Sequence, residues 1–245
     1  MNDYLRLTRT HSYSLLFALP LLILYEVGAM LTASVGGSNL RNGADVLLQM
    51  VLAVGGIEGT LGVAIAVVAG GTILIVRERR KRAVPLRLKT FASMALESCV
   101  YAVLLGMVVG TATRMIVNNL PGPLSMAPLT ELPMSEAIVL SLGAGLYEEL
   151  VFRVLLVGGL FAALRGSGLR QGQAGVVAVL LASVMFSAFH YIGPYGDPWA
   201  LSSFLFRFLA GLAFSALFLT RGFGIAAWSH ALYDLILVAA LGLQS

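Results

Sequence analysis

Charged residues and cysteine are scarce in this sequence. Asp, Glu, Lys and Arg together make up 11% of the 245 residues, whereas an ordinary soluble domain carries about 25%. The single cysteine, Cys99, excludes an intramolecular disulfide and a paired-thiol metal site. Hydrophobic residues are abundant instead, at 58% of the chain, and the mean hydropathy is +0.90. A composition so poor in charge excludes an ordinary soluble domain and indicates an integral membrane protein.

Long apolar runs, separated by turn residues and charges, predict about seven membrane-spanning helices of roughly 20 residues each. The apolar run 46–54 is cut off from the next one by the sequence GGIEG. It therefore predicts an extra interfacial or re-entrant helix, with Asp45 at its N-cap. We expect an all-α, polytopic transmembrane helical bundle that forms one membrane-embedded domain over residues 1–245. The expected spans are 12–35, 60–76, 90–117, 135–164, 175–192, 199–219 and 223–243.

The basic residues lie between the apolar runs. Their largest group is the sequence RERRKRAVPLRLK, residues 77–89, while the alternate loops hold almost no basic residue except Arg41. Because cytoplasmic loops carry an excess of Lys and Arg, this bias predicts a cytoplasmic N-terminus. We expect a protein that is surrounded by the lipid bilayer and has no nucleic-acid partner.

The sequence YEELVFR places charged residues inside the expected span 135–164. A charge at the bilayer centre costs about 2.5–3.5 kcal/mol by insertion scales, so intramembrane ionisable residues indicate function. Glu149 and Arg153 are four residues apart and are expected to form an ion pair on one helix face. Glu148 is turned by about 100° from Glu149 in an α-helix. We therefore expect the two carboxylates to have different roles.

Two further spans carry polar residues at helical spacing. The sequence FSAFH ends at His190, and HALYD contains His230 and Asp234, one turn apart. The three polar sets are expected to converge on one interior site. His230, however, lies only about eight residues into its span, nearer the cytoplasmic side than Glu148 and His190. Either the loop before the last span is sunk into the membrane, or its boundaries differ from those expected.

This set of side chains is suited to hydrolysis. A carboxylate beside a histidine can hold and deprotonate a water molecule, and a second histidine can donate to a developing oxyanion. The reaction would be hydrolysis of a carbonyl compound, such as a peptide bond. The sequence has neither a His-Glu-x-x-His zinc helix nor a Gly-x-Ser-x-Gly nucleophile elbow. Zinc held by Glu148, His190 and His230 fits the usual ligand types, but the pattern requires no cofactor.

Two other interpretations stay open at this point. Intramembrane Glu, His, Asp and Arg also mark transporters and proton relays, although the sequence shows no internal repeat of the transporter kind. An inactive membrane scaffold that binds a partner's transmembrane segment is the third interpretation. The intact Glu148, His190 and His230 argue against it.

The three polar motifs resemble those of a known family. EELVFR is similar to the Glu-Glu-x-x-x-Arg motif of the CAAX protease and bacteriocin-processing (CPBP) family of intramembrane glutamic proteases, which includes the CAAX prenyl endopeptidases. FSAFH resembles its Phe-x-x-x-His motif, and HALYD its His-x-x-x-Asn/Asp motif. The resemblance covers about 136–241, and LPLLILYEVG is similar to the first helix of some bacterial members.

The resemblance implies an intramembrane endopeptidase of the bacterial inner (cytoplasmic) membrane, whose substrate is a membrane-anchored protein or peptide. Glu148 and His190 would activate water without a metal ion, while His230 and residue 234 would form the oxyanion hole. The catalytic core would comprise residues 135–243. The oligomeric state and the identity of the substrate are not implied.

One position departs from the prenyl endopeptidases, which carry Asn where this chain has Asp234. Many bacterial members of the family carry Asp there. An ionised Asp only accepts hydrogen bonds, whereas Asn also donates them. Asp234 is therefore expected either to be protonated or to orient His230. By the same resemblance, Glu149 and Arg153 would support the site.

Overall fold

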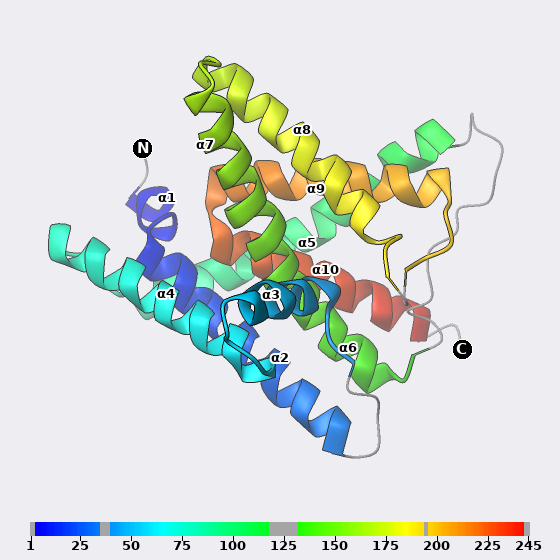
Figure 1. Ribbon diagram of the computed structural model, residues 1–245, viewed down its shortest axis with the longest axis horizontal. Helices are drawn as coiled ribbons and strands as arrows, with labels where there is room; N and C mark the ends of the chain where they lie inside the picture. Colours follow the sequence, from blue (N-terminus) through cyan, green and yellow to red (C-terminus); the bar gives the residue numbers. More distant parts are fainter. Residues whose placement is uncertain (1–2, 35–39, 118–131, 194–195, 243–245) are drawn as a thin grey trace.

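The computed structural model describes residues 3–34, 40–117, 132–193 and 196–242, and this part of the chain contains helices and no strand. Six of the helices are long and apolar enough to cross a membrane. The predicted all-α, polytopic membrane fold is therefore confirmed (Figure 1). The six helices are α2 (His11–Ser34), α4 (Thr60–Lys81), α5 (Leu88–Val117), α8 (Gln171–Phe189), α9 (Leu201–Arg221) and α10 (Phe223–Gly242).

The expected span 135–164 is a composite helix. It consists of α6 (Met134–Gly143), the π-helical segment η2 (Ala144–Val157) and α7 (Gly158–Gly166). The junction residues Gly143, Ala144 and Gly158 keep helical backbone angles, so the three segments follow one another directly. The π-helical segment was not predicted, and it carries the two glutamates and Arg153.

A short apolar helix, α3 (Gly43–Val54), lies where an interfacial piece was expected. Its N-cap is Asn42 rather than the predicted Asp45. The side-chain oxygen of Asn42 accepts a hydrogen bond from the backbone N–H of Ala44 at 2.9 Å, whereas Asp45 lies in the first helical turn. Gly56 and Gly59 have φ angles of 81° and 94°, and this backbone conformation, which glycine adopts freely, separates α3 from α4.

Helix α10 is the central helix of the fold. It packs against α2, α5, α6, η2 and α9, and it is the most buried of the six long apolar helices. A β-carbon on Gly145 of η2 would lie 2.5 Å from the carbonyl oxygen of Ala227 and 2.6 Å from the β-carbon of Ala231. The absence of a side chain at Gly145 therefore allows the π-helical segment to contact the backbone of α10.

A one-residue corner joins α9 to α10. Gly222 turns the chain with a φ of 87°, and a β-carbon on Gly224 would lie 2.5 Å from the backbone oxygen of Ser14 in α2. Arg221 and Phe223 on either side are buried. The corner is thus sunk into the protein, beneath the junction of α2 and the short helix α1 (Asp3–Thr8). This position explains why His230 reaches the site only seven residues after α10 begins.

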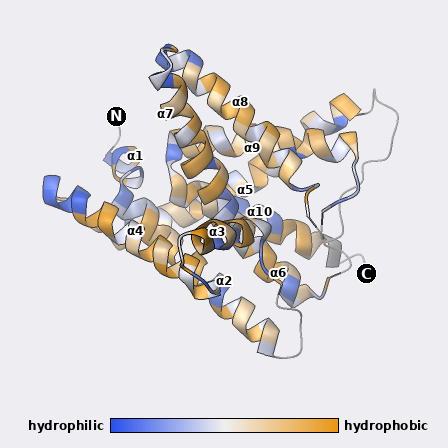
Figure 2. Cartoon of the chain, in the orientation of Figure 1, coloured by the Kyte–Doolittle hydropathy of each residue, from blue (hydrophilic) through white to orange (hydrophobic). Residues whose placement is uncertain are grey.

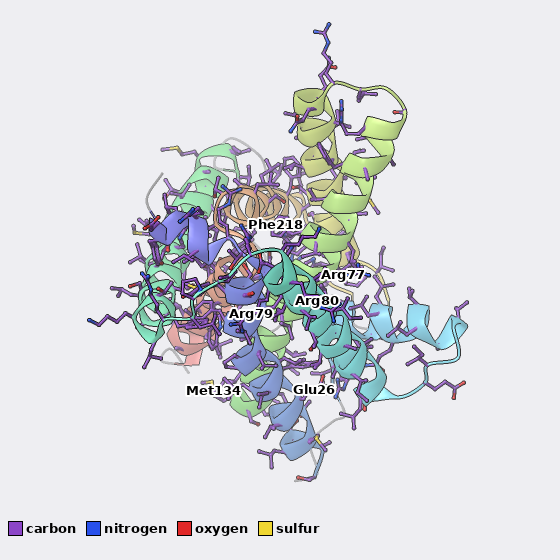
Figure 3. The ribbon with its side chains drawn as sticks, turned by 90° about the vertical axis from the view of Figure 1, so that its left-hand side faces the viewer. Glu26, Arg77, Arg79, Arg80, Met134 and Phe218 are labelled. Carbon is purple, nitrogen blue, oxygen red and sulfur yellow. The ribbon has the colours of Figure 1, made fainter. Side chains whose placement is uncertain are left out.

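The polar residues gather at the helix ends and along the centre of the fold. Figure 2 shows hydrophilic residues at the end of α4 and at the turn between α7 and α8, with hydrophobic residues along much of the helices between them. In Figure 3 the side chains of Arg77, Arg79 and Arg80 lie near one another on α4, above Glu26 and Met134 in the view. The basic cluster therefore marks one end of the helical bundle.

Candidate active site

Both glutamates of η2 are buried and both face His230. Glu148 exposes 8% of its surface and Glu149 none. One carboxylate oxygen of Glu149 lies 2.8 Å from Nδ1 of His230, and one of Glu148 lies 4.0 Å from Nε2. The expectation that the carboxylates would diverge rested on α-helical geometry, and η2 is π-helical. π-Helical segments are rare in proteins, and those that do occur often lie at functional sites.

Glu149 has two partners. Its Oε1 accepts a hydrogen bond from Nδ1 of His230 and lies 3.2 Å from Nη1 of Arg153. The structure thus contains the predicted ion pair and adds a contact to the histidine. The Arg153 guanidinium is 1% exposed and lies over the Phe186 ring, 4.3 Å from its centroid. Glu149 therefore connects the buried cation directly to the imidazole of His230.

The imidazole of His230 is contacted both at a ring nitrogen and on the face of the ring. Phe214 of α9 stacks on the ring with 4.4 Å between centroids, and the Glu149 bond fixes Nδ1. Asp234 lies on the other side of the ring, with its Oδ2 3.7 Å from Nε2, beyond hydrogen-bond range. One of the two alternatives expected from the sequence was that Asp234 would orient His230 by accepting a hydrogen bond from its ring. In the structure Glu149 accepts the hydrogen bond from His230 instead, because the π-helical turn brings its carboxylate to Nδ1.

His190 lies at the C-cap of α8, at the end of the helix rather than within it. Its Nδ1 is 2.9 Å from the carbonyl oxygen of Phe186. A carbonyl oxygen only accepts, so Nδ1 carries the proton, and Nε2 of the neutral ring is free to accept one. His190 interacts electrostatically with Glu148. The Phe186 ring lies 5.0 Å from His190 and 6.3 Å from His230, centroid to centroid.

One residue of the site was not predicted. Asn42, the N-cap of α3, donates from its Nδ2 to Oε1 of Glu148 at 2.9 Å. It lies 106 residues before Glu148 in the chain and is 7% exposed. Its sequence context, a polar residue four positions before the apolar run 46–54, indicates a helix cap and nothing more. Only the packing of α3 against η2 shows the contact to the carboxylate.

Among the residues that the structure describes, no group of three or more His, Cys, Asp and Glu side chains is arranged as a metal site. Glu148, His190 and His230, whose side chains are of the usual zinc-ligand types, therefore form no such group. The site does contain carboxylate oxygens, imidazole nitrogens and one amide. These groups can accept, donate and relay protons between a water molecule and a bound carbonyl compound.

An apolar groove of about 420 Å³ lies beside the site, between α3, η2 and α8. Its lining includes Leu47, Phe152, Met185, Phe189 and Ile192. The ring of Phe152 also contacts the ring of Phe186 next to the histidines, with 5.2 Å between centroids. The groove thus shares an aromatic wall with the candidate active site.

Comparisons with known proteins identify the segment that carries the site. No curated protein and no solved structure matches the chain. The family model described as type II CAAX prenyl endopeptidase Rce1-like matches residues 130–236, a little under half of the chain. This match confirms the family indicated by the three motifs and contains all six predicted site residues. Within residues 130–236, the chain is therefore similar to the type II CAAX prenyl endopeptidase Rce1-like family.

Proposed function

We propose that this protein is an intramembrane endopeptidase of the glutamic type, which hydrolyses a peptide bond in a membrane-associated protein or peptide. The family match supports protease activity in general. The observation that carries the finer proposal is the meeting of the buried Glu148 of η2 and His230 of α10 with the half-buried His190 at the end of α8. The apolar groove beside it supports a substrate that is held in the membrane.

In the proposed reaction, Glu148 and Nε2 of His190 act on one water molecule. The water oxygen attacks the scissile carbonyl carbon while its proton passes to the Glu148–His190 pair. The carbonyl oxygen becomes an oxyanion, which accepts a hydrogen bond from His230. The tetrahedral intermediate collapses by breaking the C–N bond, and the stored proton passes to the leaving amine. Water is thereby consumed and a carboxylic acid and an amine are formed.

His230 can donate to the oxyanion only in one protonation state. Its Nδ1–H is directed to Glu149, so Nε2 carries a hydrogen only when the ring is an imidazolium. Nε2 lies 4.0 Å from a Glu148 oxygen and 3.7 Å from an Asp234 oxygen. We propose that Asp234 acts as the counter-charge of this imidazolium, while Arg153 is the counter-charge of Glu149.

The proposal is tested with Glu148→Gln, which keeps the size of the side chain and removes the base. We expect substrates to accumulate uncleaved in membrane and secreted proteomes from cells with Glu148→Gln, compared with wild type. The purified variant, reconstituted in vesicles, should bind those substrates without cleaving them. Glu58→Gln is the matched control, because the same change at an exposed turn should leave cleavage intact.

The same assay tests the metal-free mechanism. Cleavage by the wild type should survive strong chelators, since water is activated by Glu148 and His190. Loss of cleavage in phenanthroline, restored only by zinc, would contradict this mechanism. A proton flux across vesicles that needs no peptide and is abolished by Glu148→Gln would support a proton relay instead.

A further inference from the structure

A cluster of buried polar residues joins α2, the start of α3 and η2. The side chain of Arg41 is 7% exposed, and its guanidinium donates hydrogen bonds to Glu26 and to Asp45 at 2.7 Å each. The Tyr147 hydroxyl donates to Glu26 at 2.9 Å. Burial alone would lower the pKa of Arg41, but the hydrogen bonds to Glu26 and Asp45 raise it above its ordinary value. The guanidinium therefore keeps its positive charge. We call the set of residues Arg41, Glu26, Asp45, Tyr147 and Tyr25 the Arg41 cluster.

The Arg41 cluster fixes the backbone of Asn42. The Tyr25 hydroxyl donates to Asp45 at 2.8 Å and accepts the backbone N–H of Asn42 at 3.1 Å. Tyr147, which belongs to the cluster through Glu26, immediately precedes Glu148 in the chain. The Arg41 cluster thus fixes the backbone of Asn42 and, through Tyr147, the residue next to Glu148.

The cap of α3 fixes the amide orientation of Asn42. Its Oδ1 accepts the backbone N–H of Ala44 at 2.9 Å, and its Nδ2 lies 2.9 Å from Oε1 of Glu148. The reversed amide would place its NH₂ group against the N–H of Ala44 and its oxygen against a carboxylate oxygen. Only one of the two orientations satisfies both neighbours.

We propose that Asn42 is a positioning residue of the active site, contributed by a part of the chain outside the family-matched segment 130–236. Its amide holds Oε1 of Glu148 and leaves Oε2 to accept a proton from the reacting water. This inference rests on the proposed peptidase function. Asn42 acts through Glu148, and the Arg41 cluster acts through Asn42.

The other groups around Glu148 cannot take over this role. His190, His230 and Arg153 interact with Glu148 electrostatically, and Asp234 is a further acid within reach of its charge. The histidines have tasks in the reaction, and Arg153 is paired with Glu149. Without the amide we expect kcat to fall on the order of 10- to 100-fold, part of the 10²–10⁴-fold that a positioned general base supplies.

The test separates the role of Asn42 as the N-cap of α3 from the role of its amide as a hydrogen-bond donor to Glu148. Asp and Ser are N-cap residues as good as Asn, so Asn42→Asp and Asn42→Ser should keep α3 folded while losing the hydrogen bond from the amide. We expect kcat to fall with little change in KM. For Asn42→Asp the pH–rate profile should also move to lower pH, because the introduced carboxyl donates to Glu148 only when protonated.

Gln49→Ala is the matched control on the same helix, since the Gln49 amide donates to Asp45 and is part of neither the cap nor the Glu148 contact. It should keep the wild-type kcat and pH profile. Unfolding temperatures of all three variants in detergent would show that their folds are comparable. Wild-type kcat and pH profile in both Asn42→Asp and Asn42→Ser would overturn the inference.

A second measurement does not depend on peptidase activity. The infrared carboxylate bands of Glu148 can be identified as those lost in Glu148→Gln. They should shift in Asn42→Asp and Asn42→Ser and stay in place in Gln49→Ala. Bands that do not move would overturn the positioning role. Shifted bands in a protein that cleaves no peptide would instead refute the proposed function and leave the contact established.

Discussion

At the scale of single residues, the site is rich in carboxylates and poor in cations. Glu148, Glu149 and Asp234 all lie within 4.0 Å of the His230 ring nitrogens, and Arg153 is paired with Glu149. A buried charge is tolerated only where a partner offsets its lost hydration. The protonation state and the packing of His230 therefore depend on every one of these neighbours.

Glu149→Gln should destabilise the fold more than Glu148→Gln does. The change leaves the buried Arg153 charge without its partner, and breaking a buried pair costs about 3–5 kcal/mol. The expected result is a much lower unfolding temperature in detergent for Glu149→Gln than for Glu148→Gln.

The double variant Glu149→Gln/Arg153→Met is the control for this interpretation. It removes both charges, so much of the stability should return, while cleavage stays low because His230 has lost its carboxylate acceptor. Equal unfolding temperatures for the two single variants would contradict the assignment of Glu149 to the ion pair.

Asp234→Asn should lower kcat and leave KM nearly unchanged. The Glu149 bond still orients the ring in this variant, but the negative charge that faces Nε2 is lost. His230→Ala should be worse, with a loss of about 10²–10³ in kcat if it supplies one oxyanion donor.

The measurement is kcat as a function of pH for the wild type, Asp234→Asn and His230→Ala. An Asn variant as fast as the wild type at every pH would show that residue 234 acts as a donor, as the Asn of the prenyl endopeptidases is expected to do. The counter-charge role of Asp234 would then be wrong.

At the scale of elements, the sequence predicted most helices but not the geometry of the composite one. Apolar runs and turn residues bound α2, α4, α5, α8, α9 and α10 to within a few residues, because hydrophobic length is a local property. The i→i+5 hydrogen bonding of η2 depends instead on packing against its neighbours, which no local pattern encodes. The same holds for Asn42, whose contact is made with a residue 106 positions away. The residue set could be predicted from spaced motifs, whereas the partner of each ring nitrogen could not.

Gly145→Ala should disturb the site through the packing of two elements. The added methyl group would meet the backbone of α10 at 2.5 Å and push η2 away, separating Glu149 from His230. Overpacking of this kind costs about 1–3 kcal/mol, and a small displacement at the reacting groups costs activity as well.

Gly159→Ala is the control on the same composite helix. A β-carbon there has no neighbouring atom within 4 Å, so stability and cleavage should be unchanged or slightly improved. Unfolding temperature and kcat of both variants are the measurements. A Gly145→Ala protein as stable and active as Gly159→Ala would show that η2 and α10 can separate without consequence.

At the scale of the whole molecule, the basic end of the bundle predicts its orientation. In a Cys99→Ser background, Arg79→Cys should react with a membrane-impermeant maleimide only after the cells are permeabilised, because the 77–89 cluster is expected on the cytoplasmic side. Met134→Cys, on an exposed residue expected on the other side, should react in intact cells. The reverse labelling pattern would invert the predicted topology.

The central place of α10 has a consequence for how the protein is made. Trp228 of α10 donates from Nε1 to the carbonyl oxygen of Phe17 in α2 at 2.7 Å, so the last described helix packs against one of the first. The ribosome delivers these helices in chain order, and η2 enters the membrane with two glutamates before His230 has been synthesised. In that interval Arg153 on the same helix and Asn42 from the earlier segment are the partners at hand for the carboxylates. We therefore expect the nascent chain to be shielded by contacts that the finished site reuses, and the candidate active site to be completed only after α10 leaves the ribosome.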